Sequence, residues 1–486
     1  MVSAAAAQTP AAPQASGSVS PTTPIAPSPS AAALDIETLT RNPAWWPKTV
    51  SLTRALSIPV TSNGQNSGQA QLPAQTAVRL IRVTGGQVEV EFLSQHFTAP
   101  FDSTDILARG TDLMRAANKV TRTPESAKSS IAESARPGNY REEAHEVMSD
   151  IQAKYWMPQA KRYAKKPDSK EADTVWGAGV MFSALVGAAR NEPDHYKTLL
   201  NSFFEGLNGY WDSKAPVPGY EPAPTSGNGH DKYYDDNAWL AITFFEAYQL
   251  TYQQQYRRRA EETLDFVLSG WDDTVLNGGI WWHELHEKKS RGKNTCANAP
   301  TAVACLLSAK KPLHVAMTDS RIAWAKKITQ WTTSNLQLEN GLFADSIGMD
   351  GGMNRAQLTY NSALMLRANL GLYRATLDAR YLTEAKRIGK AADGFMNSEK
   401  TAYRDAVKWS HLMVEADLAL YRATHEEYLW ERAKKNADHY YQQWKEHPPE
   451  DLISVASIAR ILWLMADQES DSGRKFWQNM ERFGDF

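Results

Sequence analysis

From about residue 140 onward, hydrophobic and polar positions follow the helical repeat, and two kinds of helix alternate along the chain. Helices of one kind are apolar almost all round, which predicts that they are buried on every side. Helices of the other kind are amphipathic and rich in charge, which predicts that they face outward. The apolar segments are 176–189, 238–250, 300–307 and 453–465, and the amphipathic segments are 196–207, 256–268, 322–331, 381–395 and 428–444.

This alternation predicts twelve helices between residues 140 and 467, arranged as six hairpins with an outer and an inner helix in each. Six buried inner helices indicate a closed (α/α)6 toroid over residues 139–470. An open solenoid is the alternative architecture. Its inner helices would keep one solvent-facing side, so the apolar pattern favours closure.

The N-terminal part of the chain has a different pattern. Residues 78–83 and 88–92 alternate in polarity on either side of a Gly85-Gly86 turn, which predicts a β-hairpin. Short strands with Pro and Gly breaks over residues 44–112 indicate a small SH3-like β-barrel. Residues 1–40 are mostly Ala, Pro, Ser and Thr, a composition that predicts a disordered tether, and residues 113–138 are predicted to be a linker.

Composition narrows the class of protein. A formal net charge of -2 argues against nucleic acid or an anionic membrane as the main partner. The chain holds 16 Trp and 19 Tyr; core packing accounts for most of them, and the surplus suits a cleft whose rings stack on sugars. Cys296 and Cys305 lie about 13 Å apart on a continuous helix, which predicts two free, buried thiols.

Cellular location is indicated only by the first ten residues. They lack an apolar core and are similar to the small-residue cleavage region of a signal peptide. No apolar run is long enough for a membrane span. We therefore expect a secreted, cell-envelope or periplasmic protein, and a monomer.

The residues with chemical potential gather just before the apolar helices, in segments 230–239, 278–282, 293–300, 359–361 and 408–411. Parallel inner helices begin at one rim of a toroid, so these segments are expected to surround one cleft. A polar rim with aromatic plates suits a carbohydrate. The candidate substrate-binding residues are Tyr234, Asn237, Trp281, Trp282, Asn294, Asn298, Tyr360, Asn361 and Trp409.

Adjacent carboxylates at Asp235 and Asp236 are the sharpest feature of this rim. Neighbouring Cα atoms are about 3.8 Å apart, so the two carboxyl groups are able to approach the separation of about 5–5.5 Å found in retaining glycosidases. Repulsion between them favours one protonated acid and one anion at the helix start. The alternative is that either residue simply caps the helix. A second pair, Asp272 and Asp273, follows an outer helix and is better explained as stabilising a turn.

Several motifs resemble glycoside hydrolase family 76: YYDDNAW (233–239), SGWDD (269–273) with NGGIWW (277–282), KNTCANAP (293–300) and TYNSALML (359–366). The resemblance covers residues 140–467. It implies an (α/α)6 barrel of retaining endo-α-1,6-mannanases and related transglycosylases, with Asp235 as nucleophile and Asp236 as acid/base. Ser362-Ala363 stands where the family often has Gln-Gly, which implies different substrate contacts there.

We therefore expect a retaining endo-hydrolase of α-1,6-linked mannan that needs no metal or cofactor. A mannan transglycosylase with the same site is an alternative. Other (α/α)6 activities, such as a glycuronyl hydrolase or a sugar epimerase, require a cationic or His-rich cleft, and few of the 11 His residues lie in the rim segments. A non-catalytic envelope glycan-binding protein is the remaining alternative, against which the intact Asp235 and Asp236 argue.

Overall fold

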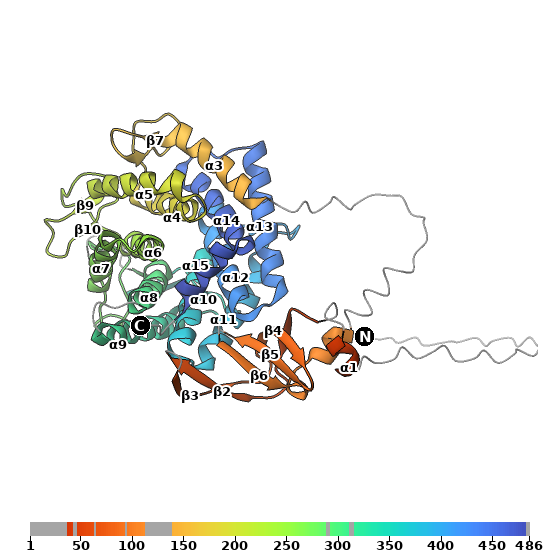
Figure 1. Ribbon diagram of the computed structural model, residues 1–486. Coiled ribbons are helices and arrows are strands. Elements are labelled where there is room, and N and C mark those ends of the chain that lie inside the picture. Colours follow the sequence, from red (N-terminus) through yellow and green to blue (C-terminus); the bar gives the residue numbers. More distant parts are fainter. Residues whose placement is uncertain are drawn as a thin grey trace, which may run out of the picture.

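The computed structural model describes residues 36–41, 46–62, 65–92, 95–111, 139–287, 292–310 and 315–482. Its larger part is helical and begins at residue 140, as the sequence predicts (Figure 1). Twelve helices follow in outer–inner order. They are α3 (Tyr140–Tyr155), α4 (Val175–Asn191), α5 (Pro193–Leu207), α6 (Tyr234–Thr251), α7 (Gln254–Ser269), α8 (Thr295–Ala309), α9 (Val315–Leu336), α10 (Thr359–Thr376), α11 (Ala379–Ala391), α12 (Val407–Thr424), α13 (Glu427–Glu446) and α14 (Leu452–Glu469).

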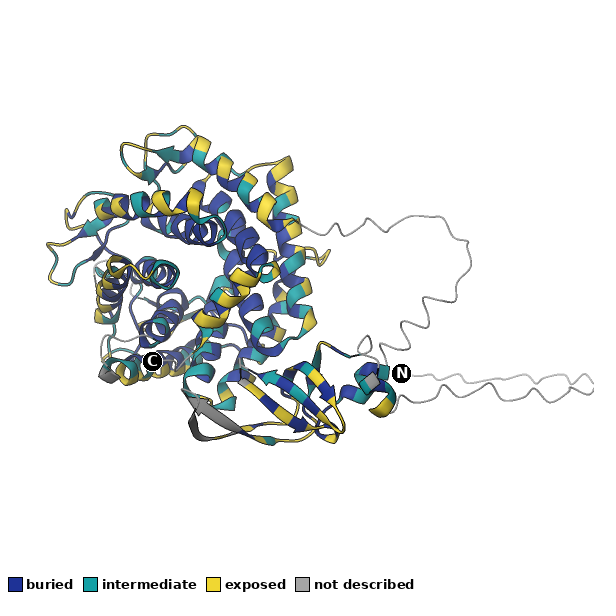
Figure 2. Cartoon of the chain, viewed as in Figure 1, coloured by how far each residue is buried: buried dark blue, intermediate teal, exposed yellow. Residues whose placement is uncertain are grey.

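The six even-numbered helices form a closed ring. Each one, from α4 to α14, contacts the next, and α14 contacts α4 to complete the circle. The odd-numbered helices form the outer layer, with α3 against α14 and the others against the inner helices that precede or follow them. Figure 2 shows the inner helices almost wholly buried and the outer helices exposed on their outward sides. The predicted (α/α)6 toroid is therefore confirmed.

One more helix, α15 (Asp471–Glu481), follows the predicted twelve and packs across the barrel at the ends of the inner helices. It contacts α14, α4 and α6. The Trp477 indole N–H donates to the buried Asp467 carboxylate at 2.9 Å, and Arg190 also donates to this carboxylate. These bonds fix α15 over the barrel end opposite the starts of the inner helices.

The N-terminal part forms two separate antiparallel sheets. A four-stranded sheet has the order β1-β4-β5-β6, and β2 and β3 pair only with each other. The hairpin predicted around Gly85-Gly86 is confirmed, because β4 pairs with β5 across this turn. The expected barrel is wrong in one respect: among the described strands, β2 lies against β6 without pairing with it, so the sheet does not close. The strands are β1 (Thr49–Ser51), β2 (Leu56–Ser62), β3 (Gln65–Leu72), β4 (Ala77–Thr84), β5 (Gln87–Phe92) and β6 (Gln95–Pro100), followed by the 3-10 helix η2 (Phe101–Ser103).

The end of the predicted tether is also not wholly unstructured. Residues 36–41 form helix α1 (Ile36–Arg41), because Leu39 is fully buried and its carbonyl accepts the Trp46 indole N–H at 2.8 Å. The rest of the predicted tether and the whole predicted linker, residues 113–138, lie outside the described residues.

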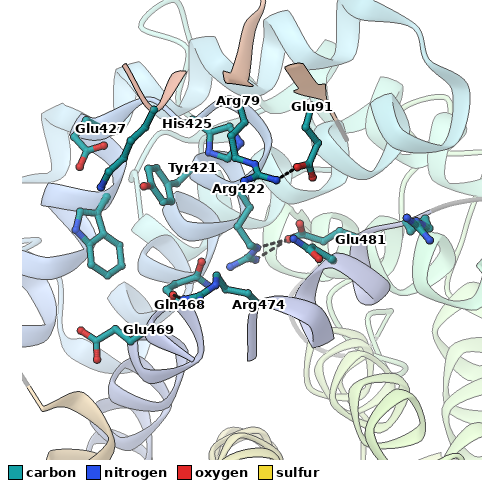
Figure 3. Close-up of a pocket in the computed structure, with 14 residues that line it drawn as sticks. Arg79, Glu91, Tyr421, Arg422, His425, Glu427, Gln468, Glu469, Arg474 and Glu481 are labelled. Atoms are coloured by element: carbon teal, nitrogen blue, oxygen red, sulfur yellow. Dashed lines mark hydrogen bonds and ion pairs between the residues drawn. The ribbon is translucent and has the colours of Figure 1, made fainter. Parts of the chain in front are cut away.

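The four-stranded sheet faces the barrel end that α15 covers (Figure 3). Arg79 and Glu91, paired across β4 and β5, line a cavity of about 490 Å³ together with residues of α12 to α15. Phe92 packs edge-on against Tyr373 near the end of α10. The N-terminal domain therefore contacts the barrel away from the starts of the inner helices.

Short strands and 3-10 helices complete the loops between helices. Cys296 and Cys305 are both free and buried in α8, as predicted. None of the helices in the described ranges is long and apolar enough to cross a membrane. The loop elements are β7 (Trp156–Met157), β8 (Arg162–Tyr163), η3 (Asn208–Tyr210), β9 (Trp211–Asp212), β10 (Gly219–Tyr220), β11 (Gly292–Asn294), β12 (Ser346–Gly348), β13 (Met353–Asn354) and η4 (Ala392–Phe395).

Candidate active site

A cavity of about 830 Å³ lies at the rim where the inner helices begin. Five inner helices, α4 to α12, bring residues of their first turns or N-terminal caps to it, and the loops before α6, α8 and α10 supply the rest. Segments separated by up to about half the chain therefore meet, as the sequence pattern predicts. The lining residues include Thr174, Trp176, Pro222, Tyr233, Asp235, Asp236, Trp239, Trp282, Asn294, Cys296, Asp345, Ser346, Asn354, Tyr360, Lys408 and Trp409.

Asp235 and Asp236 occupy the first turn of α6 and both line this cavity. The Asp235 carboxylate accepts three hydrogen bonds. Its Oδ1 accepts the Asp236 backbone N–H at 2.9 Å, and its Oδ2 accepts the Trp282 indole N–H at 3.0 Å and the Cys296 thiol at 3.3 Å. The N-cap of α6 is Tyr233, without a side-chain capping bond, so neither aspartate serves as the helix cap.

The Asp236 carboxyl is in a different environment. Within the described part of the chain it accepts no hydrogen bond, although it shares the helix turn with Asp235. Burial, followed by repulsion from the Asp235 carboxylate, raises the pKa of Asp236 well above its usual value. Burial also raises the pKa of Asp235, but the three donors oppose that rise. The pair therefore ionises at Asp235 first, and Asp236 retains its proton.

The Trp282 loop is held against the start of α6 by its backbone. The Tyr234 N–H donates to the Trp282 carbonyl at 3.0 Å, and Tyr233 forms an isolated β-bridge with His283. The rings of Tyr233 and Trp282 meet edge-to-face with centroids 5.3 Å apart. This attachment fixes the indole N–H at its distance from Asp235.

The turn that precedes Trp282 in the chain requires Gly278 and Gly279, whose φ values of 131° and 94° favour glycine. A Cβ on Gly279 would lie 2.5 Å from the Trp331 ring, so a side chain has no room there. The buried Lys293 ammonium donates to the carbonyls of Asp272, Val275 and Gly278 at 2.6–2.8 Å. Residues 277–279 and Lys293 therefore determine the shape of the loop that carries Trp282.

Four of the nine candidate substrate-binding residues line the cavity: Trp282, Asn294, Tyr360 and Trp409. The other five are buried behind it, and the structure gives no support for direct substrate contact by them. Tyr234 stacks on Phe266 with centroids 5.0 Å apart, and Trp281 stacks on His286 at 4.2 Å. Asn361 is fully buried and donates to Asp345 at 3.5 Å. The remaining two are Asn237 and Asn298.

Asn237 and Asn298 perform the same structural task, each as the fourth residue of its inner helix. The Asn237 amide accepts the Tyr220 N–H at 2.8 Å and donates to the Tyr220 carbonyl at 3.0 Å. Asn298 does the same with Ile280, at 2.8 and 3.1 Å. These side chains therefore position the loops that approach the cleft.

Ser362 occupies the equivalent fourth position of α10. Its hydroxyl accepts the Phe343 N–H at 3.1 Å, and both Ser362 and Ala363 are fully buried. The expectation that this departure from the family pattern alters substrate contacts is therefore not supported, because neither side chain lines the cavity.

Sequence reasoning missed several lining residues. Trp176 and Asp345 lie outside the rim segments that the sequence indicates. Trp239 and Lys408 lie within segments 230–239 and 408–411 but are not among the candidate binding residues. Lys408 holds its ammonium 5.6 Å from the Trp176 ring centre and 5.2 Å from that of Trp409. Asp345 belongs to the loop between α9 and α10, and burial raises its pKa. Its position in the chain carries no signal of the cleft, since only the barrel brings that loop there.

The rival pair Asp272 and Asp273 stabilises its own loop. Asp272 accepts from the Thr274 backbone and hydroxyl at 2.8 and 2.6 Å, and Asp273 accepts the Trp271 indole N–H at 2.8 Å. Hydrogen bonds and nearby lysines keep the pKa of both below the usual value. Neither lines the cavity that holds Asp235.

The arrangement suits acid–nucleophile chemistry on a sugar. Two carboxyl groups lie side by side in a cleft whose walls carry four tryptophans, and the pKa of Asp236 is the more strongly raised of the two. In the described ranges, no group of three or more His, Cys, Asp or Glu side chains is arranged to hold a metal ion.

Comparisons with known proteins support the fold. The chain is similar to the family 76 α-mannanase of Bacteroides thetaiotaomicron, with 24% identity and a TM-score of 0.64 over 68% of this chain and 96% of that one. It is similar to the α-1,6-mannanase of Salegentibacter sp., with 21% identity and a TM-score of 0.57 over 67% and 98%. An inactive variant of that enzyme in complex with α-1,6-mannotriose gives 21% identity and a TM-score of 0.56, again over 67% and 98%.

No curated protein matches the chain significantly. The sequence model of glycosyl hydrolase family 76 matches residues 139–447, which is more than half of the chain and includes every residue that lines the cleft. Together with the closed helical barrel and the paired aspartates at its rim, this match shows that the chain belongs to glycosyl hydrolase family 76 and is a glycoside hydrolase.

Proposed function

We propose that this enzyme is a retaining endo-hydrolase of α-1,6-linked mannan, with Asp235 as nucleophile and Asp236 as acid/base. The observation that carries the proposal is the unequal environment of the two carboxyl groups. Asp235 accepts three hydrogen bonds and Asp236 accepts none from the described residues. The mannan substrate is supported by the α-1,6-mannanase of Salegentibacter sp., which has the same fold.

In the first step, an Asp235 oxygen attacks the anomeric carbon as the glycosidic C–O bond breaks. Asp236 gives its proton to the departing oxygen, and a mannosyl ester on Asp235 remains. In the second step, Asp236, now ionised, takes a proton from water, whose oxygen attacks the anomeric carbon. The ester bond breaks, Asp235 leaves as a carboxylate, and the product keeps the α configuration.

The rest of the cleft binds the polymer. The indole rings of Trp176, Trp282 and Trp409 offer flat faces for pyranose rings, and Lys408 adds a cation between two of them. A cleft of this volume, lined by residues of five inner helices, is consistent with internal cleavage of a chain. If an acceptor sugar enters in place of water, the same ester intermediate leads to transglycosylation.

Product analysis with linear α-1,6-mannan tests the activity. We expect soluble manno-oligosaccharides of several lengths early in the reaction, with the α anomer formed first by NMR. Products longer than any expected from hydrolysis would identify the transglycosylase instead. No products from α-1,6-mannan, with cleavage of another glycan, would overturn the proposed substrate.

Substitution of each aspartate tests the assigned roles. Asp235→Asn is expected to reduce turnover by several orders of magnitude, because no ester is able to form. Asp236→Asn is expected to retain the first step on mannosides with very good leaving groups, which need little protonation. Azide then attacks the ester of the Asp236 variant and yields the α-mannosyl azide, the result of two inversions.

Asp272→Asn is the matched control, since this carboxylate lies outside the cleft, and its activity is expected to stay close to that of the wild type. The β-azide from Asp236→Asn, or near-full activity in both cleft variants, would contradict the assignment.

The proposed polymer is a material found outside cells, so we also propose that the enzyme acts outside the cytoplasm or in the envelope, as a monomer. Fractionation of the source cells and light scattering of the purified protein test these two points.

A further inference from the structure

A third, much smaller cavity of about 50 Å³ lies among α8, α10, α12 and α15, at the barrel end opposite the cleft. Trp477 and Met480 of α15 form part of its wall, and aliphatic residues of α8 and α10 form another part. A space of this size admits a small inorganic ion or a few water molecules and excludes a sugar.

The charged residues that line this cavity are unbalanced. Four are cations and two are carboxylates, an excess of two positive charges: Lys310, Arg367, Arg374, Glu415, Arg422 and Glu481. Arg460, which lies 3.3 Å from Glu415, does not add to this excess, because it is paired with the buried Glu246 at 2.8 Å. Buried charge of one sign is costly unless a counter-charge accompanies it.

Each carboxylate already has its cations. Glu481 accepts from Arg374 at 2.9 Å and from Arg422 at 2.7 Å, and the bond to Arg422 is visible in Figure 3. Glu415 pairs with Arg367 at 3.0 Å. These contacts fix the three guanidinium groups around the cavity.

The same guanidinium groups keep N–H donors that no atom of the described residues accepts. Nη1 of Arg367, Nε of Arg374 and Nη1 of Arg422 are buried and lack a hydrogen-bond partner. The three side chains are only 9–10% exposed, so bulk water does not satisfy these donors. Three unsatisfied cationic donors around one cavity form an arrangement that an anion completes.

We propose that this cavity is a binding site for a small monovalent anion such as chloride, which links α15 to the ends of the inner helices. The anion accepts the free N–H groups of Arg367, Arg374 and Arg422 and offsets the positive excess. The site lies at the far end of the barrel from Asp235 and takes no part in the proposed chemistry. Burial and the neighbouring guanidinium groups lower the pKa of Lys310 to about 7, a shift that a bound anion would oppose.

Anion-dependent stability of the full chain tests the proposal. Thermal unfolding is measured at pH 6, where Lys310 is mostly charged, in mixtures of sodium chloride and sodium gluconate at constant ionic strength. An anion that binds only the folded state raises Tm with its concentration. We expect a rise of about 1–3 °C for each tenfold increase in chloride above its Kd, the same with bromide, and none with gluconate.

Lys310→Gln removes one cation at the cavity edge and is expected to weaken the chloride dependence, shifting its midpoint at least tenfold to higher concentration. Lys435→Gln, at an exposed position of α13, is the matched control and is expected to leave the dependence unchanged. Bromide-soaked crystals provide a direct readout that needs no variant: an anomalous peak among the three arginines is expected.

Equal unfolding curves in chloride and gluconate, together with no bromide peak in the cavity, would overturn the proposal and leave water as the occupant. If Lys310→Gln does not fold, the wild-type curves and the bromide map decide the question. Loss of mannanase activity plays no part in this test, so its outcome is independent of the proposed function.

Discussion

The Cys296 sulfur lies 3.3 Å from Oδ2 of Asp235, the same oxygen that accepts the Trp282 indole N–H at 3.0 Å. Burial and the nearby carboxylate raise the pKa of the Cys296 thiol well above its usual value, so the sulfur keeps its proton and acts as a donor. The Tyr360 hydroxyl is in hydrogen-bond contact with this sulfur. A thiol on α8 therefore helps to hold the proposed nucleophile on α6 as an anion.

Cys296→Ala is expected to lower kcat about threefold to thirtyfold, because a hydrogen bond to a charged group contributes about 1.5–3 kcal/mol and a thiol is a weak donor. The pKa of Asp235 should rise, which moves the acidic limb of the kcat/KM profile to higher pH. Cys296→Ser, which restores a donor, should recover most of the loss. Cys305→Ser on the same helix is the control; an equal effect there would assign the loss to helix packing.

The pH profile of kcat/KM is expected to be bell-shaped. Activity falls at low pH as Asp235 becomes protonated, and at high pH as Asp236 loses its proton. Because burial raises both pKa values, both limbs should lie above the usual aspartate value of 3.8. Asp236→Asn should abolish the basic limb on mannosides with good leaving groups. A basic limb that persists in this variant would assign the titration to another group.

Asp236→Asn is also expected to raise Tm. The half-buried Asp236 carboxyl has a raised pKa, so its ionisation opposes folding as pH increases past its unfolded value, and the amide removes this cost. Thermal unfolding of both proteins between pH 4 and pH 8 measures the effect, which should grow with pH; a lower Tm for the variant across this range would contradict it.

Trp281 and Trp282 are adjacent but should behave differently. Trp282 lines the cleft and donates to Asp235, so Trp282→Phe is expected to lower kcat more than it raises KM, and Trp282→Ala to impair both. Trp281 is 5% exposed and stacks on His286, so Trp281→Ala should cost about 3–5 kcal/mol of unfolding free energy. Kinetic measurements and urea unfolding of the Trp282 and Trp281 variants separate the two roles. Weaker mannan binding by a stably folded Trp281 variant would show that Trp281 contacts substrate.

Asn298→Ala is expected to lower the unfolding free energy by about 1–3 kcal/mol, because it leaves the N–H and carbonyl of the buried Ile280 unpaired. Asn369→Ala is the control, since within the described residues its amide bonds only to Met365 of its own helix. If Asn298→Ala instead raises KM for mannan at unchanged stability, the residue contacts substrate as the sequence first indicated.

A chain that begins at residue 137 is expected to keep kcat/KM on short soluble substrates, because every residue that lines the cleft follows it. Its Tm should fall, since Tyr373 loses its contact with Phe92 and the opposite end of the barrel becomes exposed. A folded chain without activity would show that the N-terminal domain contributes to the site.

The sequence alone determined the barrel, because a helix that is apolar on all sides, such as α4 or α14, is stable only where other helices surround it. It also determined the place of Asp235 and Asp236, since the helical pattern begins next to them. Only the tertiary structure decided which rim residues reach the cleft. Asn237 and Trp281 are sequence neighbours of residues that line the cleft, yet their side chains point into the core. There the Asn237 amide bonds to loop backbone, and the Trp281 ring stacks on His286. Trp176 and Asp345 meet Asp235 only because ring closure brings their segments to one rim, and periodicity along the chain does not encode that proximity.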